Sequence, residues 1–103
     1  MKKIKVDRIC SSSISKIIGL MFSRKRTILL KFKQNQKISL HNFFVFFSLN
    51  LYFLDRRNKV IEIKKRFLPF TFYTSKKQAV SVVESPFDLK LKIGQRILLS
   101  KNY

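Results

Sequence analysis

Cysteine and histidine are nearly missing from this chain, and their scarcity limits the chemistry it can perform. Cys10 is the one cysteine, so no disulfide can form within the chain, and a reducing, cytoplasmic location is expected. With the one histidine, His41, it would need carboxylates such as Asp7 or Asp55 to reach the roughly four ligands that zinc takes. A nucleophilic Cys10–His41 pair would need adjacent strands to hold it, whereas a buried thiol and a structural histidine are simpler. We therefore expect no metal and no cofactor.

Glycine and acidic residues are scarce as well. Gly19 and Gly94 are the only glycines, so the sequence lacks the glycine-rich loop that holds phosphates in nucleotide-binding enzymes. Glu62 and Glu84 fall on different predicted strands, and no pattern brings them together as a catalytic pair. We predict no catalytic residue, and a small soluble binding protein rather than an enzyme.

Positive charge and apolar side chains are what the chain has in abundance. Lysine and arginine number 23 against 5 aspartate and glutamate residues, which gives a formal net charge of +18 at pH 7. Such a charge attracts polyanions, nucleic acid first and an anionic membrane surface second, although it can also be a background composition that maintains solubility. At 46% hydrophobic with 11 phenylalanines, the chain can bury a core, and its length fits one domain over residues 1–103.

The longest apolar stretch, LHNFFVFFSLNLYFLD at residues 40–55, is predicted to be buried β structure. A spanning helix needs about 20 mostly apolar residues, whereas polar side chains interrupt this stretch and only Phe43 to Phe47 is unbroken. A run of that length suits a strand buried on both faces or a crossover through the core, and membrane association through it is an alternative. The N-terminus lacks the apolar run of about 7–15 residues found in a signal peptide, which supports the cytoplasmic expectation.

Hydrophobic periodicity predicts a mainly β (α+β) fold, a barrel-like sheet of about six to seven strands with one helix near the N-terminus. Alternation places Ile4 and Val6 on one face of the first strand. It likewise places Leu49, Leu51 and Phe53 on one face of a central strand. The predicted strands are residues 2–9, 27–33, 38–47, 49–54, 60–65, 78–84 and 95–100.

Two segments have the signals of helices. Three serines can cap a first helix, whose apolar face is formed by Ile14, Ile17, Ile18 and Met21. Ser85, Pro86 and Asp88 fit the N-cap and first turn of a short C-terminal helix or helical turn. Gly94 follows it at a position that tolerates positive φ.

Polar or proline-containing segments predict the remaining connections. Residues 34–37 have the composition of a turn, and residues 55–59 that of a hairpin connection. Residues 66–77, which contain Pro69, are interpreted as a loop or an irregular edge.

Several short motifs follow one another in an order that resembles a known family. GLMF at residues 19–22 precedes ILLKF, and LHNFFVFFSLNLYFLD leads through KVIEI and an aromatic loop to AVSVVE and KIGQRI. This order is similar to that of domain of unknown function 192, especially its archaeal-type members, over about residues 4–100. The resemblance implies a small, single-domain, mainly β fold of barrel-like character with one or two helices. It implies no reaction, because the family has no assigned activity.

A few positions depart from the family's motifs. His41 keeps the family's histidine, whereas Asn42, Ser48 and Asn50 stand where Met, Pro and Asp are usual, and Gln95 replaces the Asp of a final Gly-Asp turn. An amide at position 50 can form hydrogen bonds but cannot act as a base or add charge at a metal. If this block lines a site, His41, Asn42 and Asn50 form a small-ligand or enzymatic site at the mouth of the barrel.

Clusters of basic residues supply the other candidate site, a surface that binds the phosphates of RNA or DNA. The candidate residues are Arg24, Lys25, Arg26, Arg56, Arg57, Lys64, Lys65, Arg66, Lys76 and Lys77. Nearby aromatic rings could stack on unpaired bases. These rings are Phe67, Phe70, Phe72 and Tyr73. If the two sets share a face, the chain is a basic nucleic-acid-binding module; if not, the charges solvate loops and the rings belong to the core.

Overall fold

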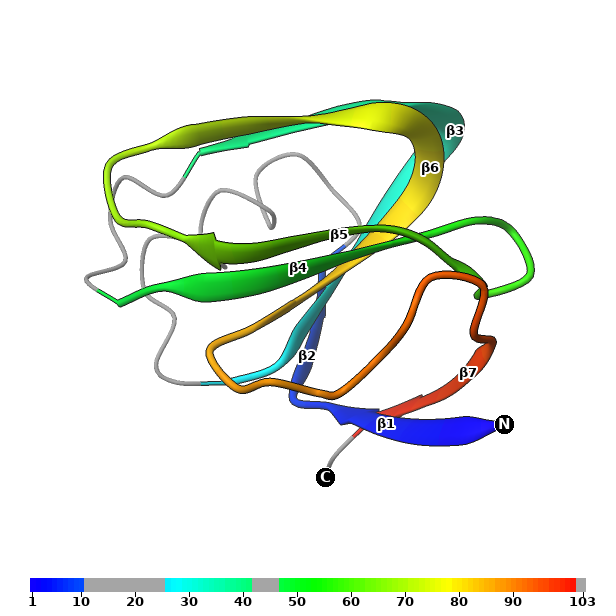
Figure 1. Cartoon of the computed structure of the whole chain (residues 1–103). Coiled ribbons are helices and arrows are strands. Elements are labelled where there is room, and N and C mark those ends of the chain that lie inside the picture. Colours follow the sequence, from blue (N-terminus) through cyan, green and yellow to red (C-terminus); the bar gives the residue numbers. More distant parts are fainter. Residues whose placement is uncertain (11–25, 42–46, 102–103) are drawn as a thin grey trace.

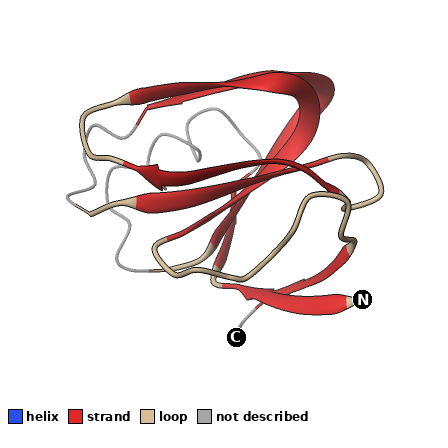
Figure 2. Cartoon of the chain, viewed as in Figure 1, coloured by secondary structure: helices blue, strands red, loops and turns tan. Residues whose placement is uncertain are grey.

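The computed structural model describes residues 1–10, 26–41 and 47–101, which form seven β-strands in two sheets (Figure 1). The strands are β1 (Lys2–Val6), β2 (Arg8–Cys10), β3 (Ile28–His41), β4 (Leu49–Leu54), β5 (Val60–Phe67), β6 (Phe72–Ser85) and β7 (Ile97–Lys101). These residues contain no helix (Figure 2). The helix expected after the serines falls on residues 11–25, outside the described part of the chain. The mainly β class is confirmed.

The larger sheet has the strand order β2-β3-β6-β4-β5. β2 runs parallel to β3, and the other neighbours are antiparallel. The smaller sheet joins the two ends of the chain, with β1 parallel to β7. The larger sheet keeps β2 and β5 as edges, so the expected barrel-like closure is wrong. A strong bend in β6 curls this sheet without closing it into a barrel (Figure 1).

The turn expected at residues 34–37 is also wrong, because β3 continues through it. A shift in register absorbs the polar run: Lys31 pairs with Ser81, but Gln36 pairs with Ala79. An irregularity of this kind lets extra residues stay in a strand while their side chains remain exposed.

β6 begins at Phe72, so the loop expected over residues 66–77 is wrong in its second half. Residues 68–71 connect β5 to β6, and Phe70 in this connection has a φ of 61°. The rest of the segment pairs with the far end of β3, as Thr74 does with Ser39. The long partner strand, rather than the local composition, extends β6.

The short helix expected from Ser85 does not form. The Oγ of Ser85 accepts the N–H of Phe87 at 3.1 Å, and Oδ1 of Asp88 accepts the N–H of Lys90 at 2.8 Å. Each side chain therefore closes its own turn instead of starting a helix. Lys90 has a φ of 56°, in the left-handed region where a right-handed helix cannot continue. Gly94 has the expected positive φ, 92°, in the turn before β7.

Two hydrophobic clusters lie on the two faces of the larger sheet, and β4 separates them. As the alternation predicts, Leu51 and Phe53 belong to one cluster, and Tyr52 and Leu54 belong to the other. All four side chains are fully buried, so the apolar stretch is confirmed as core strand over residues 49–54. Within the described residues, no helix has the length and apolar character needed to cross a membrane.

The smaller sheet contributes to the cluster that contains Tyr52. Ile4 and Val6 are 5% and 1% exposed, which confirms their predicted inward direction. The strand expected over residues 2–9 is broken at Asp7, which ties the chain to Thr27. The carboxylate of Asp7 accepts the Thr27 N–H at 2.9 Å, and the Asp7 N–H donates to the Thr27 carbonyl at 2.7 Å. Both sheets thus contribute to the cluster that contains Tyr52.

Candidate nucleic-acid interface

The predicted basic residues of β5 and of the preceding turn lie at opposite ends of one hairpin. Arg56 and Arg57 are exposed in the β4–β5 turn, where Oδ1 of Asp55 accepts the Arg57 N–H at 2.8 Å. Lys64 lies near the end of β5. At a rise of about 3.3 Å per residue, the two basic groups lie roughly 20 Å apart, so they do not form one compact patch.

Lys76 and Lys77 lie in β6 rather than in the loop where they were predicted, and both are exposed. They occupy a bulge, because the register with β3 shifts between the residues that flank them. A bulge leaves backbone N–H groups without partners in the strand ladder, and these N–H groups need other acceptors.

Glu62 on β5 supplies those acceptors. Its Oε1 accepts the N–H groups of Lys76 and Lys77, each at 2.9 Å, and its Oε2 is 3.1 Å from the Lys76 nitrogen. Oε2 also accepts the hydroxyl of Tyr73. We call Glu62, Lys64, Tyr73, Lys76 and Lys77 the β5–β6 cluster.

The bonds to Glu62 determine which groups of the cluster are charged. Burial raises the pKa of Glu62, but the hydrogen bonds from Tyr73, Lys77 and Lys76 outweigh burial and place the pKa below its ordinary value. Burial and the bond to Glu62 raise the pKa of Tyr73 to about 12. At neutral pH the carboxylate is ionised and the phenol is neutral, and the negative charge is held by backbone donors.

The ammonium groups of the cluster remain on its outside. The Nζ of Lys64 lies 5.5 Å from the centroid of the Tyr73 ring, within cation–π range. Lys76 and Lys77 bond to Glu62 through their backbone, so their side chains are left to face solvent. One bound carboxylate thus accompanies three lysines.

Lys65 differs from its neighbour because side chains alternate along a strand. Its Nζ forms an ion pair with Oδ1 of Asp88 at 2.7 Å and lies 5.4 Å from the ring centroid of Tyr52. The hydrogen bond between them raises the pKa of Lys65 and lowers the pKa of Asp88. Lys65 therefore stays charged, and Asp88 balances its charge on the opposite face of β5 from the cluster.

The segment that joins β5 to the start of β6 carries two exposed aromatic rings. Phe70 and Phe72 are 61% and 74% exposed, and Phe72 immediately precedes Tyr73. Phe67 is instead fully buried in the core, so its ring cannot stack on a base. Because side chains alternate along a strand, Phe72 faces the opposite side of β6 from Tyr73. Exposed apolar rings mark a surface that can contact a ligand.

Lys33 and Lys37 on β3 were missed by the sequence reasoning. Both are exposed, and Lys37 pairs with Gln78, the residue after Lys77. The assumed turn at residues 34–37 hid Lys37, whereas Lys33 ended a strand that was predicted. The alternation that continues through the end of β3 was an available signal for Lys37. Lys37 extends the positive surface from the cluster onto β3.

The basic residues expected after the first helix add little to this surface. Arg24 and Lys25 lie outside the described residues. Arg26 is half-buried just before β3, and its Nε is buried without a hydrogen-bond partner. Arg66 is exposed at the end of β5, and its backbone has a φ of 55°.

The residues predicted for a small-ligand site have separate surroundings. His41 ends β3, and Asn42 lies outside the described residues. Both ends of the Asn50 amide bind backbone: Nδ2 donates to the Phe87 carbonyl at 3.0 Å, and Oδ1 accepts the Arg66 N–H at 3.3 Å. The amide thus supplies a donor that the family's usual carboxylate lacks. A ligand at these residues stays a prediction.

Groups suited to metal or covalent chemistry do not gather in the part of the chain that the structure describes. There, no three side chains of the metal-binding types lie close enough to hold an ion. Cys10 is buried in the core. Glu84 is also buried, its Oε1 has no hydrogen-bond partner, and burial raises its pKa to about 8. Glu62 instead bonds to the β6 bulge.

Comparison with known proteins identifies the family. The model of DUF192, described as "Uncharacterized ACR, COG1430", matches residues 2–98. The chain belongs to this family. A UPF0127 protein from Pyrococcus horikoshii is 32% identical over 84% of this chain and 76% of that protein. A UPF0127 protein from Pyrococcus furiosus is 27% identical over 93% of this chain and 89% of that protein. The resemblance to domain of unknown function 192, with archaeal relatives, is confirmed.

Two solved structures share the fold. A "putative transcription regulator" from Sinorhizobium meliloti 1021 matches 75% of this DUF192 chain with a TM-score of 0.69 and 16% identity. A protein of unknown function from Novosphingobium aromaticivorans matches 75% with a TM-score of 0.65 and 16% identity. This chain covers 64% and 59% of those two chains, less than two thirds of either. At this identity the likeness shows the fold alone.

Proposed function

We propose that this DUF192 protein is a non-enzymatic binding protein for nucleic acid, and that the β5–β6 cluster with Phe70 and Phe72 forms the contact surface. One observation carries the proposal. The carboxylate of the cluster, Glu62, binds the backbone of the β6 bulge, which leaves the lysine side chains directed outward. Across the chain, pairing each of the 5 acids with one of the 23 bases would still leave 18 positive charges.

The cations of this surface suit phosphate groups. A lysine ammonium binds a phosphate oxygen as a point charge and reads no base. Lys76 and Lys77 are neighbours in a bulge, where strand alternation is broken, and Lys37 lies beside them on β3. Binding through these residues is therefore independent of sequence and releases counterions, so its affinity falls as salt rises.

The exposed rings favour a single strand over a duplex. A base stacked on an aromatic ring contributes about 1–3 kcal/mol, but the bases of a duplex are already stacked on each other. Phe70 and Phe72 are more than half exposed and lie on the segment that enters the cluster. The ligand favoured by this combination is an unpaired stretch of RNA or DNA.

The description of one solved structure with this fold agrees with the proposal. The Sinorhizobium meliloti protein is described as a "putative transcription regulator", and its fold matches 75% of this chain. That description concerns the other protein, and the charge and exposed rings of this chain support the proposal independently.

Fluorescence anisotropy with a labelled single-stranded oligonucleotide tests the proposal. The double variant Lys76→Gln/Lys77→Gln removes two charges from the cluster, and Arg56→Gln/Arg57→Gln removes two from the far hairpin turn. We expect the first to weaken binding about tenfold or more and the second to change it by less than about threefold. Equal weakening by both variants would show that net charge alone attracts the strand. Absence of binding by the unaltered protein at physiological salt would overturn the proposal.

A further inference from the structure

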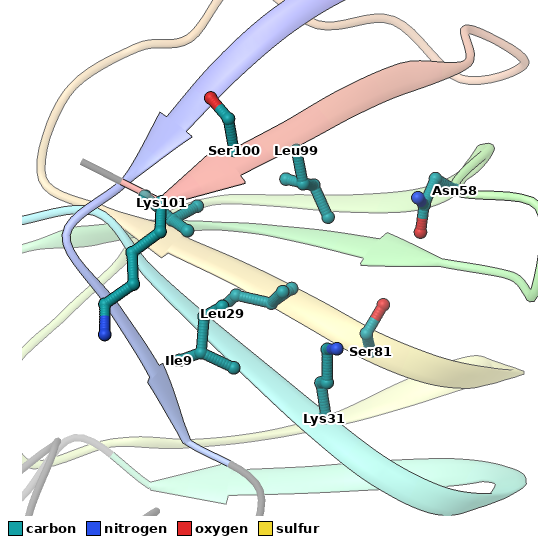
Figure 3. Close-up of a pocket in the computed structure, with 9 residues that line it drawn as sticks. Ile9, Leu29, Lys31, Asn58, Ser81, Leu99, Ser100 and Lys101 are labelled. Carbon is teal, nitrogen blue, oxygen red and sulfur yellow. The ribbon is translucent and has the colours of Figure 1, made fainter. Parts of the chain in front are cut away.

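A cavity of about 240 Å³ lies between the two sheets. The strands β1 and β7 of the smaller sheet lie on one side of this cavity, and β3 and β6 of the larger sheet lie on the other (Figure 3). Leu29 and Leu99 lie in the middle of this space and give it an apolar lining. Leu29 belongs to the cluster that the smaller sheet covers, so the cavity opens on the opposite face of the larger sheet from Glu62.

Three hydrogen-bond donors of the larger sheet and of the β4–β5 turn line this cavity, and Ser100 and Lys101 of β7 add two more. Lys31 and Ser81 are direct partners in the β3–β6 ladder, so their side chains share a face, and Figure 3 shows them side by side. Asn58 faces them from the β4–β5 turn. Among the described residues, none of these three side chains has a hydrogen-bond partner, although Ser81 is only 6% exposed. The hydroxyl of Ser81 and the ammonium of Lys31 are thus side by side at the cavity and available to a ligand.

The position of Asn58 is fixed before any ligand arrives. Its φ of 58° is a conformation that asparagine tolerates better than most residues. Its N–H donates to the Asp55 carbonyl at 3.1 Å, and its carbonyl accepts the Ile97 N–H at 3.0 Å. Because the backbone is held on both sides, the amide side chain projects from a rigid rim, which lowers the entropic cost of binding.

We propose that this cavity binds a small monocarboxylate with a compact apolar body. The ammonium of Lys31 and the hydroxyl of Ser81 can both donate to one carboxylate, while Leu29 and Leu99 contact the apolar part. The volume equals about eight water molecules, below the roughly 300–1,000 Å³ of drug-sized sites, so the ligand is about the size of benzoate.

Nitrogen-15 NMR titration of the full chain tests this site with benzoate, its neutral analogue benzyl alcohol, and inorganic phosphate. We expect benzoate to cause saturable shifts at the amides of Leu29, Lys31, Ser81 and Leu99, with at least about tenfold weaker binding of benzyl alcohol. Lys31→Gln, a change at an exposed side chain, should weaken benzoate about tenfold and leave benzyl alcohol unchanged. Lys76→Gln/Lys77→Gln should leave benzoate binding unchanged, which separates this site from the nucleic-acid surface.

Three results would overturn the site. The first is benzoate shifts that do not saturate or that spread over surface lysines. The second is phosphate binding as tight as benzoate binding, which would indicate a simple anion site. The third is unchanged benzoate affinity in the Lys31→Gln variant, with a spectrum showing that the variant is folded.

Discussion

The hydroxyl of Tyr73 on β6 donates a hydrogen bond to the carboxylate of Glu62 on β5, where no strand ladder joins the two strands in the described structure. β6 pairs with β4 only through residues 81–85, and β5 is an edge of the sheet. Hydrogen bonds from β6 to the side chain of Glu62 therefore hold the first half of β6 over that edge. The same bonds engage this carboxylate with the backbone N–H groups of Lys76 and Lys77 rather than with their ammonium groups.

Replacing Glu62 tests its role as a bridge. Glu62→Gln keeps one acceptor oxygen for the N–H groups of Lys76 and Lys77, but it removes the charge that strengthens these bonds and puts an amide donor in place of the oxygen that accepts the Tyr73 hydroxyl. Hydrogen bonds to a charged group contribute about 1.5–3 kcal/mol each, against about 0.5–1.5 kcal/mol for neutral ones. We expect a loss of about 2–4 kcal/mol in the free energy of unfolding, measured by urea denaturation. Tyr73→Phe, which removes only the hydroxyl bond, should cost about 1 kcal/mol. Equal stability of Glu62→Gln and the unaltered protein would contradict the bridge.

Glu84 should make the protein less stable as pH rises from weakly acidic to weakly basic. Burial raises its pKa from 4.5 to about 8, so between these values the folded state holds a proton that the unfolded state has released. The contribution of Glu84 is therefore full below pH 4.5 and is lost as pH rises towards 8, by on the order of 4 kcal/mol in total.

Denaturation at a series of pH values measures this effect. Glu84→Gln should flatten the curve between pH 4.5 and 8. Glu62→Gln should keep the slope, because the lowered pKa of Glu62 makes its contribution present above 4.5 and lost only at lower pH. A stability that stays level or rises over this window in the unaltered protein would rule out a neutral, buried Glu84.

Restoring the family's usual aspartate at position 50 should destabilise this chain. Asn50→Asp keeps the acceptor for the Arg66 N–H but replaces the donor to the Phe87 carbonyl with a second oxygen, at a cost of about 1–3 kcal/mol. Asn35→Asp is the matched control, because the Asn35 amide is exposed and bonds only the Gln78 side chain; we expect about 0.5 kcal/mol or less. Thermal denaturation that finds Asn50→Asp as stable as the unaltered chain would reject the assigned donor.

Substitutions at two phenylalanines distinguish an effect on stability from an effect on nucleic-acid binding. Phe67→Ala removes a fully buried ring and should cost about 3–5 kcal/mol of unfolding free energy. Phe72→Ala removes a ring that is 74% exposed, and its stability should change by about 1 kcal/mol or less. Phe72→Ala should weaken single-strand binding about fivefold or more and leave duplex binding unchanged. Unchanged single-strand affinity in this folded variant would remove stacking from the proposal.

Local sequence was sufficient where a segment's own pattern decides its structure. The alternation in β4 predicted which side chains enter each cluster, because every second residue faces the same side of a strand. The hairpin at Asp55 was also predicted, and its carboxylate accepts the N–H groups of Arg57 and Lys59 at 2.8 and 3.0 Å. These interactions lie within a few residues of each other.

Predictions were wrong where distant partners decide the structure. The polar ends of β3 and β6 looked like a turn and a loop, yet they pair with each other across more than thirty residues of sequence, as Ser39 and Thr74 do. The candidate site depends on the same pairing. Alternation could have separated Lys64 from Lys65, but no local signal indicates the bulge that brings the N–H groups of Lys76 and Lys77 to Glu62.

The salt dependence of binding to a single strand tests the central claim most directly. Each phosphate contact on a single strand contributes about 0.7 to the slope of log affinity against log salt. If Lys76 and Lys77 each contact a phosphate, Lys76→Gln/Lys77→Gln should reduce the slope by about 1.4, and Arg56→Gln/Arg57→Gln should leave it unchanged. Equal reductions in both variants, or none in either, would contradict a binding surface at the β5–β6 cluster.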